Sequence, residues 1–191
     1  MSEQLKKLNY LYKLKEVYRH STLKGRTESS AEHSWSVMML AEYFLIKKGF
    51  VEKYNIDKLK VFRLLLYHDL IEIEAGDTPL YGPDREKKDK KETLILPRLL
   101  EEMPEAIAKE QILLFQEFGE LKTVEAKFAK AIDKLDPLVH AAHIKTDWKA
   151  VKATEQVLRD KHQKYLVPFP ELMKLFEEII KHAKEMEFIT E

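Results

Sequence analysis

The sequence has no cysteine and only five glycines in 191 residues. The lack of cysteine excludes a disulfide scaffold and every thiolate metal site, so a bound metal would need His, Asp, Glu, backbone or water ligands. No run approaches the ~18 apolar residues that a membrane-spanning helix needs. Residues 1–7 also lack the apolar segment of a signal peptide. We therefore expect a cytoplasmic protein with no membrane partner.

An excess of charge of either sign is also missing. Lys plus Arg and Asp plus Glu both number 33, so the formal net charge is zero. General nucleic-acid binding exploits a basic excess, and the balance therefore argues against a nucleic-acid partner. Hydrophobic residues make up 45% of the chain, which is enough for a sizeable core. Because no shift in composition marks a boundary, we expect a single domain over residues 1–191.

Strand signals are weak, because alternating β-branched runs between turn residues are absent. Helical patterns fill most of the chain and predict helices that begin near residues 3, 30, 57, 84, 104, 123, 148 and 170. The third is expected to run to about residue 75 and the seventh to about residue 164. Ser29 or Ser30, Asp57 and Thr123 are suited to cap three of them. Polar residues 19–29 and residues 77–83 are expected to form loops. The fold class expected is all-α, a bundle of roughly 7–9 helices.

Three of the expected helices carry an ionisable side chain on an otherwise apolar face, at His33, His68 and Asp133. Asp69 follows about 100° around the helix from His68. Burying an unpaired charge costs several kcal/mol, and neighbouring carboxylates repel each other. A divalent cation would remove both penalties, and two His with two Asp suit Mn, Fe, Co, Ni or Zn better than Mg.

Each of these residues also has a plain structural explanation when it is taken alone. A single buried histidine is more often hydrogen-bonded in the core than bound to a metal, and Asp133 could pair with a buried Lys or Arg. We expect packing or surface roles for His140 and His143. Helical periodicity places the three ionisable groups on inward faces, but it does not show that they meet.

Around these residues the sequence resembles the HD-domain metal-dependent phosphohydrolases. The H…HD…D pattern of that family stands here as His33, His68-Asp69 and Asp133. The longer string His-Asp-x-x-Glu-x-x-x-Gly-Asp starts at His68 and is more specific. Three segments resemble the 5′-deoxynucleotidase branch of the family: residues 26–35, 67–79 and 125–134. The resemblance covers about residues 10–150.

The resemblance implies a helical HD domain with additional C-terminal helices, and one divalent metal ion held by His33, His68, Asp69 and Asp133. It implies hydrolysis of deoxyribonucleoside 5′-monophosphates to nucleoside and phosphate. It also implies a homodimer, to which apolar residues of the last helix could contribute: Leu172, Leu175, Phe176 and Ile179. The same residues could equally cover the core of their own chain.

The resemblance further assigns roles to residues around the metal. Glu72 would orient or deprotonate the attacking water, and Arg19 would bind the phosphate through its guanidinium fork. Asp77 would lie near the sugar, with the loop from Thr78 to Gly82 as a pocket wall. His20 stands where better-known bacterial members have a tryptophan, so selectivity for deoxyribose is open and His20 itself is a candidate substrate contact. Each role has a structural alternative. Arg19 could be an ordinary charge at the end of a helix, Glu72 a surface charge, and Asp77 a cap or turn residue.

Two other functions remain open at this point. The same fold and metal could act on a nucleoside triphosphate or a cyclic nucleotide. Alternatively, the chain could be a non-catalytic module that binds a metal or a nucleotide. Because Glu72 and Arg19 are both present, the sequence favours an enzyme.

Overall fold

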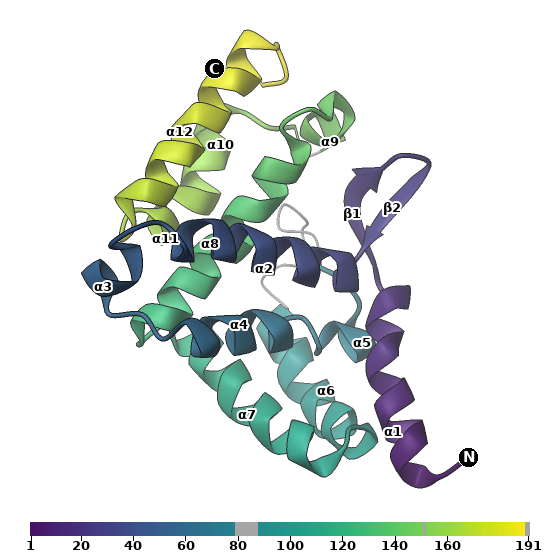
Figure 1. Ribbon diagram of the computed structural model, residues 1–191. Coiled ribbons are helices and arrows are strands. Elements are labelled where there is room, and N and C mark those ends of the chain that lie inside the picture. The colour runs from purple at the N-terminus through teal and green to yellow at the C-terminus, as the bar shows by residue number, and fades with distance from the viewer. Residues whose placement is uncertain (79–87, 151, 190–191) are drawn as a thin grey trace.

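The computed structural model describes residues 1–78, 88–150 and 152–189, and the side chains of all of these except 88–93 (Figure 1). The predicted pocket wall beyond Thr78 lies outside the described residues. Seven of the helices in the described part of the chain have nine or more residues. The all-α class is confirmed, apart from one small hairpin that the sequence did not predict.

The N-terminal region is helical and then turns into a hairpin. Helix α1 (Glu3–Leu11) is capped by the Ser2 side chain and continues as the 3-10 helix η1 (Tyr12–Glu16). Strands β1 (Tyr18–Leu23) and β2 (Arg26–Ser29) then pair antiparallel. The prediction of a loop here was wrong, because this hairpin is too polar and too short to show an alternating apolar pattern.

Two of the next three helices begin at the predicted caps. Ser29 and Glu32 form a capping box at the start of α2 (Ser30–Leu45), and the Asp57 side chain caps α4 (Lys58–Tyr67) after the short α3 (Phe50–Tyr54). The predicted helix 57–75 was too long. It is interrupted at residues 68–71, where backbone hydrogen bonds such as Glu72 N to Asp69 O span three residues, before α5 (Glu72–Ala75).

The second half of the chain supplies the remaining helices. Helix α6 (Lys88–Glu102) continues through Pro97, and α7 (Glu105–Glu120) and α8 (Val124–Ala141) follow, the last capped by Thr123 as predicted. The predicted helix 148–164 is divided: Trp148 lies in a separate α9, and a helix capped by Thr154 includes a π segment. The elements are α9 (Lys145–Ala150), α10 (Glu155–Leu158), η3 (Arg159–Gln163), α11 (Lys164–Leu166) and α12 (Pro170–Glu185).

Helix α8 runs through the centre of the molecule. Figure 1 shows α2 and α4 side by side across it, with α7 below and the C-terminal helices on its other side. The largest apolar cluster contains residues from all of these helices. Leu172, Phe176 and Ile179 of α12 are buried in this cluster, and Leu175 packs against it. These residues therefore cover the core of their own chain, and they give no support to a dimer.

Among the described residues, no helix has the length and apolar character needed to cross a bilayer. The cytoplasmic location and the single domain stay predictions.

Candidate metal centre

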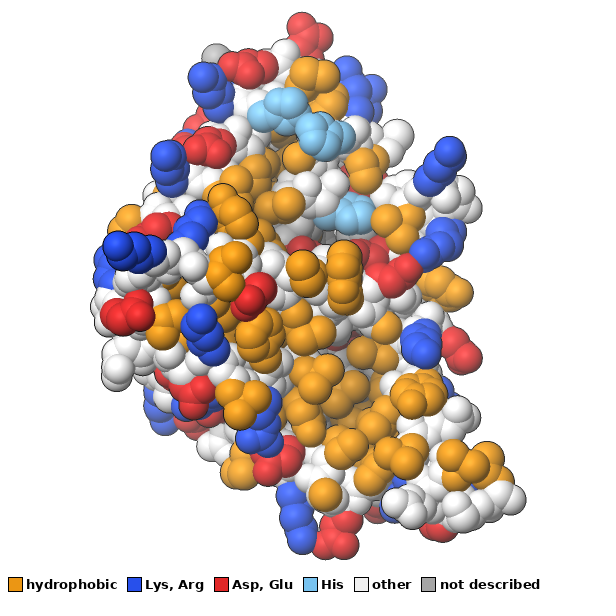
Figure 2. All heavy atoms as spheres, viewed as in Figure 1, with side chains coloured by type: hydrophobic (Ala, Val, Ile, Leu, Met, Phe, Trp, Pro, Cys, Tyr) orange, Lys and Arg blue, Asp and Glu red, His pale blue; other side chains and the backbone are white. Residues whose placement is uncertain are grey.

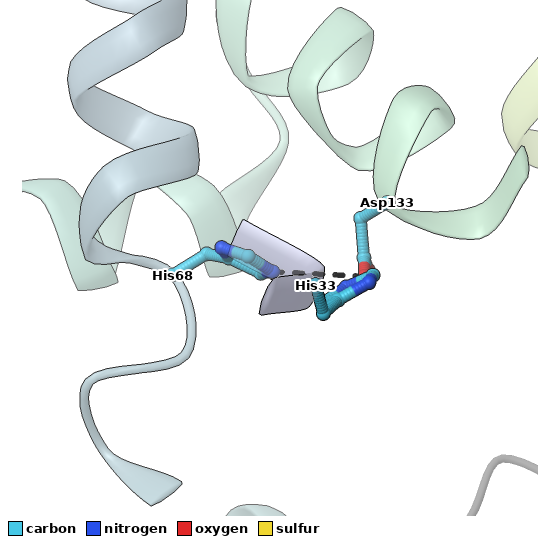
Figure 3. A group of neighbouring side chains, drawn as sticks. All are labelled: His33, His68 and Asp133. Atoms are coloured by element: carbon cyan, nitrogen blue, oxygen red, sulfur yellow. Dashed lines mark hydrogen bonds and ion pairs between the residues drawn. The ribbon is translucent and has the colours of Figure 1, made fainter. Parts of the chain in front are cut away.

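Three of the four predicted metal ligands converge inside the helical core (Figure 3). His33 lies in the first turn of α2, His68 at the end of α4 and Asp133 in the middle of α8. One side-chain nitrogen or oxygen of each lies within 4.8 Å of the other two. All three residues are buried. The faces predicted from helical periodicity therefore do meet.

The spacing of these atoms suits coordination of one ion. Asp133 Oδ1 lies 3.4 Å from His33 Nε2 and 3.8 Å from His68 Nε2. The fourth candidate, Asp69, places its Oδ2 3.2 Å from His68 Nε2 and 3.8 Å from His33 Nε2. Ligand atoms about 2.1 Å from one metal lie about 3 Å apart when they are adjacent. Small adjustments would therefore bring all four side chains onto a common cation.

Local backbone structure fixes where the two histidines point. The capping box starts α2 three residues before His33, which places His33 in the first turn. Arg26 reinforces this start, because its Nη1 donates to Glu32 Oε2 at 2.8 Å. His68 follows the last residue of α4, and its Nδ1 lies 2.6 Å from the Leu65 carbonyl oxygen. In a continuous α-helix that carbonyl would accept from the amide of Asp69, so the side chain takes part in ending the helix.

The same contacts leave the second nitrogen of each ring available to a metal. Because a carbonyl can only accept, His68 Nδ1 donates to Leu65, and in the neutral ring Nε2 then carries a lone pair. His68 Nε2 is buried and has no hydrogen-bond partner within the described residues. His33 Nδ1 lies 2.9 Å from Asp136 Oδ2, the carboxylate–histidine arrangement that orients metal ligands. These donors fit a divalent transition metal.

The shifted pKa values of the cluster show that several negative charges are buried close together, which a cation would compensate. Burial opposes the protonated form of His33, but the carboxylates of Asp133 and Asp136 outweigh burial and raise its pKa to about 9. Burial would raise the pKa of the Asp69 carboxyl, yet His68 and Arg19 lower it well below the usual range. The pKa of Asp133 is lowered too, against burial, by Lys134 and Lys130. Without a metal, a proton on His33 takes the place of the cation.

Arg19 reaches the cluster from the hairpin. Its Nη1 lies 3.1 Å from Asp69 Oδ2, 3.9 Å from Glu72 Oε2 and 3.8 Å from Asp77 Oδ1. Its Nε lies 3.7 Å from Glu28 on the paired strand, but it forms no hydrogen bond among the described residues. Burial opposes the charged form of Arg19, but the carboxylates of Asp69, Glu72, Asp77 and Asp133 raise its pKa. The hairpin therefore holds a cationic fork directly beside a predicted metal ligand.

The remaining predicted residues differ in how close they lie to the cluster. Glu72 is buried beside it and accepts a hydrogen bond of 2.8 Å from Ser30 Oγ. Asp77 reaches it through Arg19, and Thr78 is half-buried at the edge of the described residues. His20 is exposed on β1, whereas its neighbour Arg19 is half-buried. The structure thus brings Glu72 and Asp77 to the cluster, but it does not bring His20 there.

Several residues of the cluster were not assigned a role from the sequence. Asp136 supports His33, and Glu28 supports Arg19 across the hairpin. Lys130 and Lys134 lie 3.2 and 3.0 Å from Asp133 Oδ2. Asp136 had a visible signal, since it lies one turn after Asp133 on the same face of α8. The pairing of Glu28 with Arg19 had no signal, because the hairpin itself was not predicted.

The other histidines do not join the cluster. His140 Nε2 lies 3.0 Å from the Thr22 carbonyl oxygen and helps to hold the hairpin against α8. The rings of His143 and His182 contact each other edge-on, 5.4 Å apart at the C-terminal end. These contacts agree with the packing or surface roles that the sequence predicted for His140 and His143.

The family and the fold are found again in known proteins. Residues 11–173 match the family model described as the HD domain. A solved structure titled "Predicted metal-dependent phosphohydrolase" from Magnetospirillum magnetotacticum is 28% identical and superimposes with a TM-score of 0.80. That superposition covers 99% of this chain and 95% of the other.

Two curated relatives are similar over a shorter segment. Proteins named 5'-deoxynucleotidase HDDC2 from Bos taurus and Homo sapiens are 29% and 28% identical over 127 residues, which is 66% of this chain. The chain spans 57% of the length of each of these relatives.

Proposed function

The chain belongs to the HD domain family, and on this premise we propose that it is a metal-dependent phosphohydrolase of (deoxy)nucleoside 5′-monophosphates. The convergence of His33, His68 and Asp133 within 4.8 Å, with Arg19 beside them, carries the proposal. The names of the two curated relatives support the substrate class. The products would be a nucleoside and inorganic phosphate.

The proposed ligands of the metal are His33, His68, Asp69 and Asp133. They suit Mn, Fe, Co, Ni or Zn, and the donor set does not choose among these. A divalent cation bound there would supply Lewis acidity for the phosphate oxygens and lower the pKa of water. The Nδ1 atom of each imidazole already forms a hydrogen bond, to Asp136 in the case of His33 and to a backbone carbonyl in the case of His68. This arrangement fixes both rings before any cation binds.

We propose Glu72 as the general base. Its carboxylate is buried next to Arg19 and is held by the Ser30 hydroxyl, so its orientation is fixed. A carboxylate in this position would take the proton of the water that attacks phosphorus. The Arg19 guanidinium would donate to the phosphate oxygens as their charge develops. Asp77 restrains Arg19 from the loop side. Substrate contacts by Asp77, Thr78 and His20 stay predictions.

The decisive experiment is phosphate release from a panel of nucleoside monophosphates by protein loaded with Mn²⁺, Co²⁺, Ni²⁺ or Zn²⁺. Triphosphates and cyclic nucleotides belong in the same panel, because they test the alternative substrates. We expect the Glu72→Gln variant to keep its metal and to lose about 10²- to 10⁴-fold in kcat. No release with any of the four metals, or an unchanged rate in the variant, would refute the corresponding part of the proposal.

We also propose a homodimer, through a different surface from the one that the sequence indicated. Figure 2 shows apolar side chains gathered over α2 and α4. On α2 and its C-cap residue they recur at the spacing of one outward face, and all are more than half exposed: Trp35, Met39, Tyr43 and Ile46. Exposed aromatic and aliphatic groups in one patch are typical of interfaces. A chain with no net charge meets little repulsion from a second copy.

Light scattering at micromolar concentration tests the dimer. We expect a dimer for the wild type and a monomer for Ile46→Lys, because the new charge would be buried in the interface. Val167→Lys is the matched control, since Val167 is similarly exposed but lies near the C-terminal helices. A monomeric wild type would end this part of the proposal.

A further inference from the structure

The two oxygens of the Asp133 carboxylate have different partners. Oδ1 faces the two imidazoles, at 3.4 Å from His33 Nε2 and 3.8 Å from His68 Nε2. Oδ2 faces two ammonium groups, at 3.2 Å from Lys130 Nζ and 3.0 Å from Lys134 Nζ. The side toward the candidate metal is therefore left to one oxygen, and the other oxygen is neutralised twice.

Packing holds both lysines in place. Lys134 is buried, and the Lys130 side chain is 19% exposed. Lys130 Nζ lies over the ring of Phe118, 4.4 Å from its centroid, and the same ring contacts His68. Lysines are rarely buried unless they are paired. Two of them on one oxygen of a predicted ligand indicate a function tied to that ligand.

The charge of the site explains why two lysines are needed. Among the described residues, six carboxylates lie within 4 Å of His33, His68 or Arg19: Glu28, Asp69, Glu72, Asp77, Asp133 and Asp136. A divalent cation and Arg19 would together supply three positive charges. A phosphate monoester is itself close to dianionic at neutral pH, so such a site would repel its substrate. With two ammonium groups added, five positive charges would face the six carboxylates, so the site would be nearly neutral before phosphate binds.

We propose that Lys130 and Lys134 are positioning residues that keep Asp133 a one-oxygen metal ligand and make the loaded site able to accept a phosphate group. They act through Asp133 and through the field of the site. The inference rests on the proposed function in one respect, that the substrate carries a phosphate group. It does not depend on which nucleobase or sugar the substrate has. The inference predicts that the lysines weaken metal binding and strengthen phosphate binding.

The opposite effects on metal binding and phosphate binding distinguish this proposal from a purely structural role for the two lysines. A lysine that merely held Asp133 in place would, when removed, loosen the ligand and weaken metal binding. A lysine that balances charge would, when removed, leave a more negative site. Cations would then bind more tightly and phosphate more weakly, since both effects follow from the same Coulomb term with opposite signs.

The test compares wild-type protein with Lys130→Met by calorimetry. Mn²⁺ is titrated into metal-free protein, and inorganic phosphate into Mn²⁺-saturated protein. We expect Lys130→Met to bind Mn²⁺ at least about threefold more tightly and phosphate at least about threefold more weakly. Lys130→Arg should restore both affinities. Lys127→Met is the matched control, because Lys127 is exposed on the same helix, and it should change neither affinity.

Weaker Mn²⁺ binding by Lys130→Met, or unchanged phosphate binding, would overturn the proposal. Thermal unfolding verifies that the variant is folded, and Lys130→Gln and Lys134→Met provide the same two titrations if it is not. Neither titration requires turnover. Failure of the nucleotidase assay would therefore refute the substrate without touching this result, and the reverse also holds.

Discussion

Two buried histidines in different parts of this protein have opposite properties. His33 and His162 are both fully buried, and each has Nδ1 in a hydrogen bond. The pKa of His33 is raised to about 9, because the carboxylates of Asp133 and Asp136 outweigh burial. The pKa of His162 is lowered to about 4, because burial dominates beside the ring of Phe176. The charge of the surroundings decides which form is stable.

Both environments are built on the same helix. Asp133 of α8 points its carboxylate toward α2 and α4, where His33 and His68 lie. The carbonyl of the next residue, Lys134, accepts the hydrogen bond of His162 from the C-terminal helices. Burial therefore marks a residue as structural or as functional only when its partners are known.

The largest effect should separate a candidate ligand from a core histidine. We expect His68→Gln to lose the bound metal and to reduce phosphate release about 10³-fold or more, because metal-assisted hydrolysis needs the ion in place. His162→Gln should keep one metal per chain and lose stability instead. Elemental analysis of the purified variants measures the first difference, and thermal unfolding measures the second. Equal metal content in the two variants would contradict the assignment of His68 as a metal ligand and His162 as a core residue.

The pH dependence of stability should show the two histidines with opposite signs. The pKa of His33 in the folded metal-free protein is above its ordinary 6.5, so its contribution is present below pH 6.5 and is lost as pH rises toward 9. The pKa of His162 is below 6.5, so its contribution is present above pH 6.5 and is lost as pH falls toward 4. Each effect is of the order of 3 kcal/mol.

Urea unfolding of the metal-free protein between pH 4 and 9 measures how the free energy of unfolding changes with pH on both sides. His33→Gln should remove the loss on the alkaline side, and His162→Gln should remove the loss on the acid side. Because a metal competes with the proton on His33, Mn²⁺ affinity should also rise between pH 6.5 and 9 in the wild type. A flat affinity over this range would contradict the assignment of His33.

The smallest effect should come from making the surroundings of His33 resemble those of His162. Asp136→Asn keeps an oxygen acceptor for His33 Nδ1 and Ser36 Oγ but removes the charge. We expect metal affinity to fall about 10-fold, as is typical for a carboxylate behind a ligating histidine. Ser36→Ala is the control and should change it less. Calorimetric titration with Mn²⁺ decides, and an unaffected affinity in Asp136→Asn would show that the carboxylate does not support the ligand.

Much of the local structure could be predicted because its causes lie within a few residues. Ser29, Asp57 and Thr123 cap helices as expected, since a cap needs only its own hydroxyl or carboxylate and an amide three residues later. The break of the helix after Tyr67 was missed, because the HD motif continues an apolar pattern across it. The hairpin was missed for lack of apolar alternation, and with it the pairing of Arg19 and Glu28.

Helical periodicity and capping depend on neighbours along the chain, so the order of residues was enough to predict which side chains face inward. Periodicity placed His33, His68 and Asp133 on inward faces, and the resemblance to the HD family added Asp69 and the metal. The three-dimensional packing brings side chains 100 residues apart, such as His33 and Asp133, within 3.4 Å of each other. It also decided which oxygen of Asp133 faces the imidazoles and which faces the lysines. These choices depend on how the helices pack, and no local pattern encodes them.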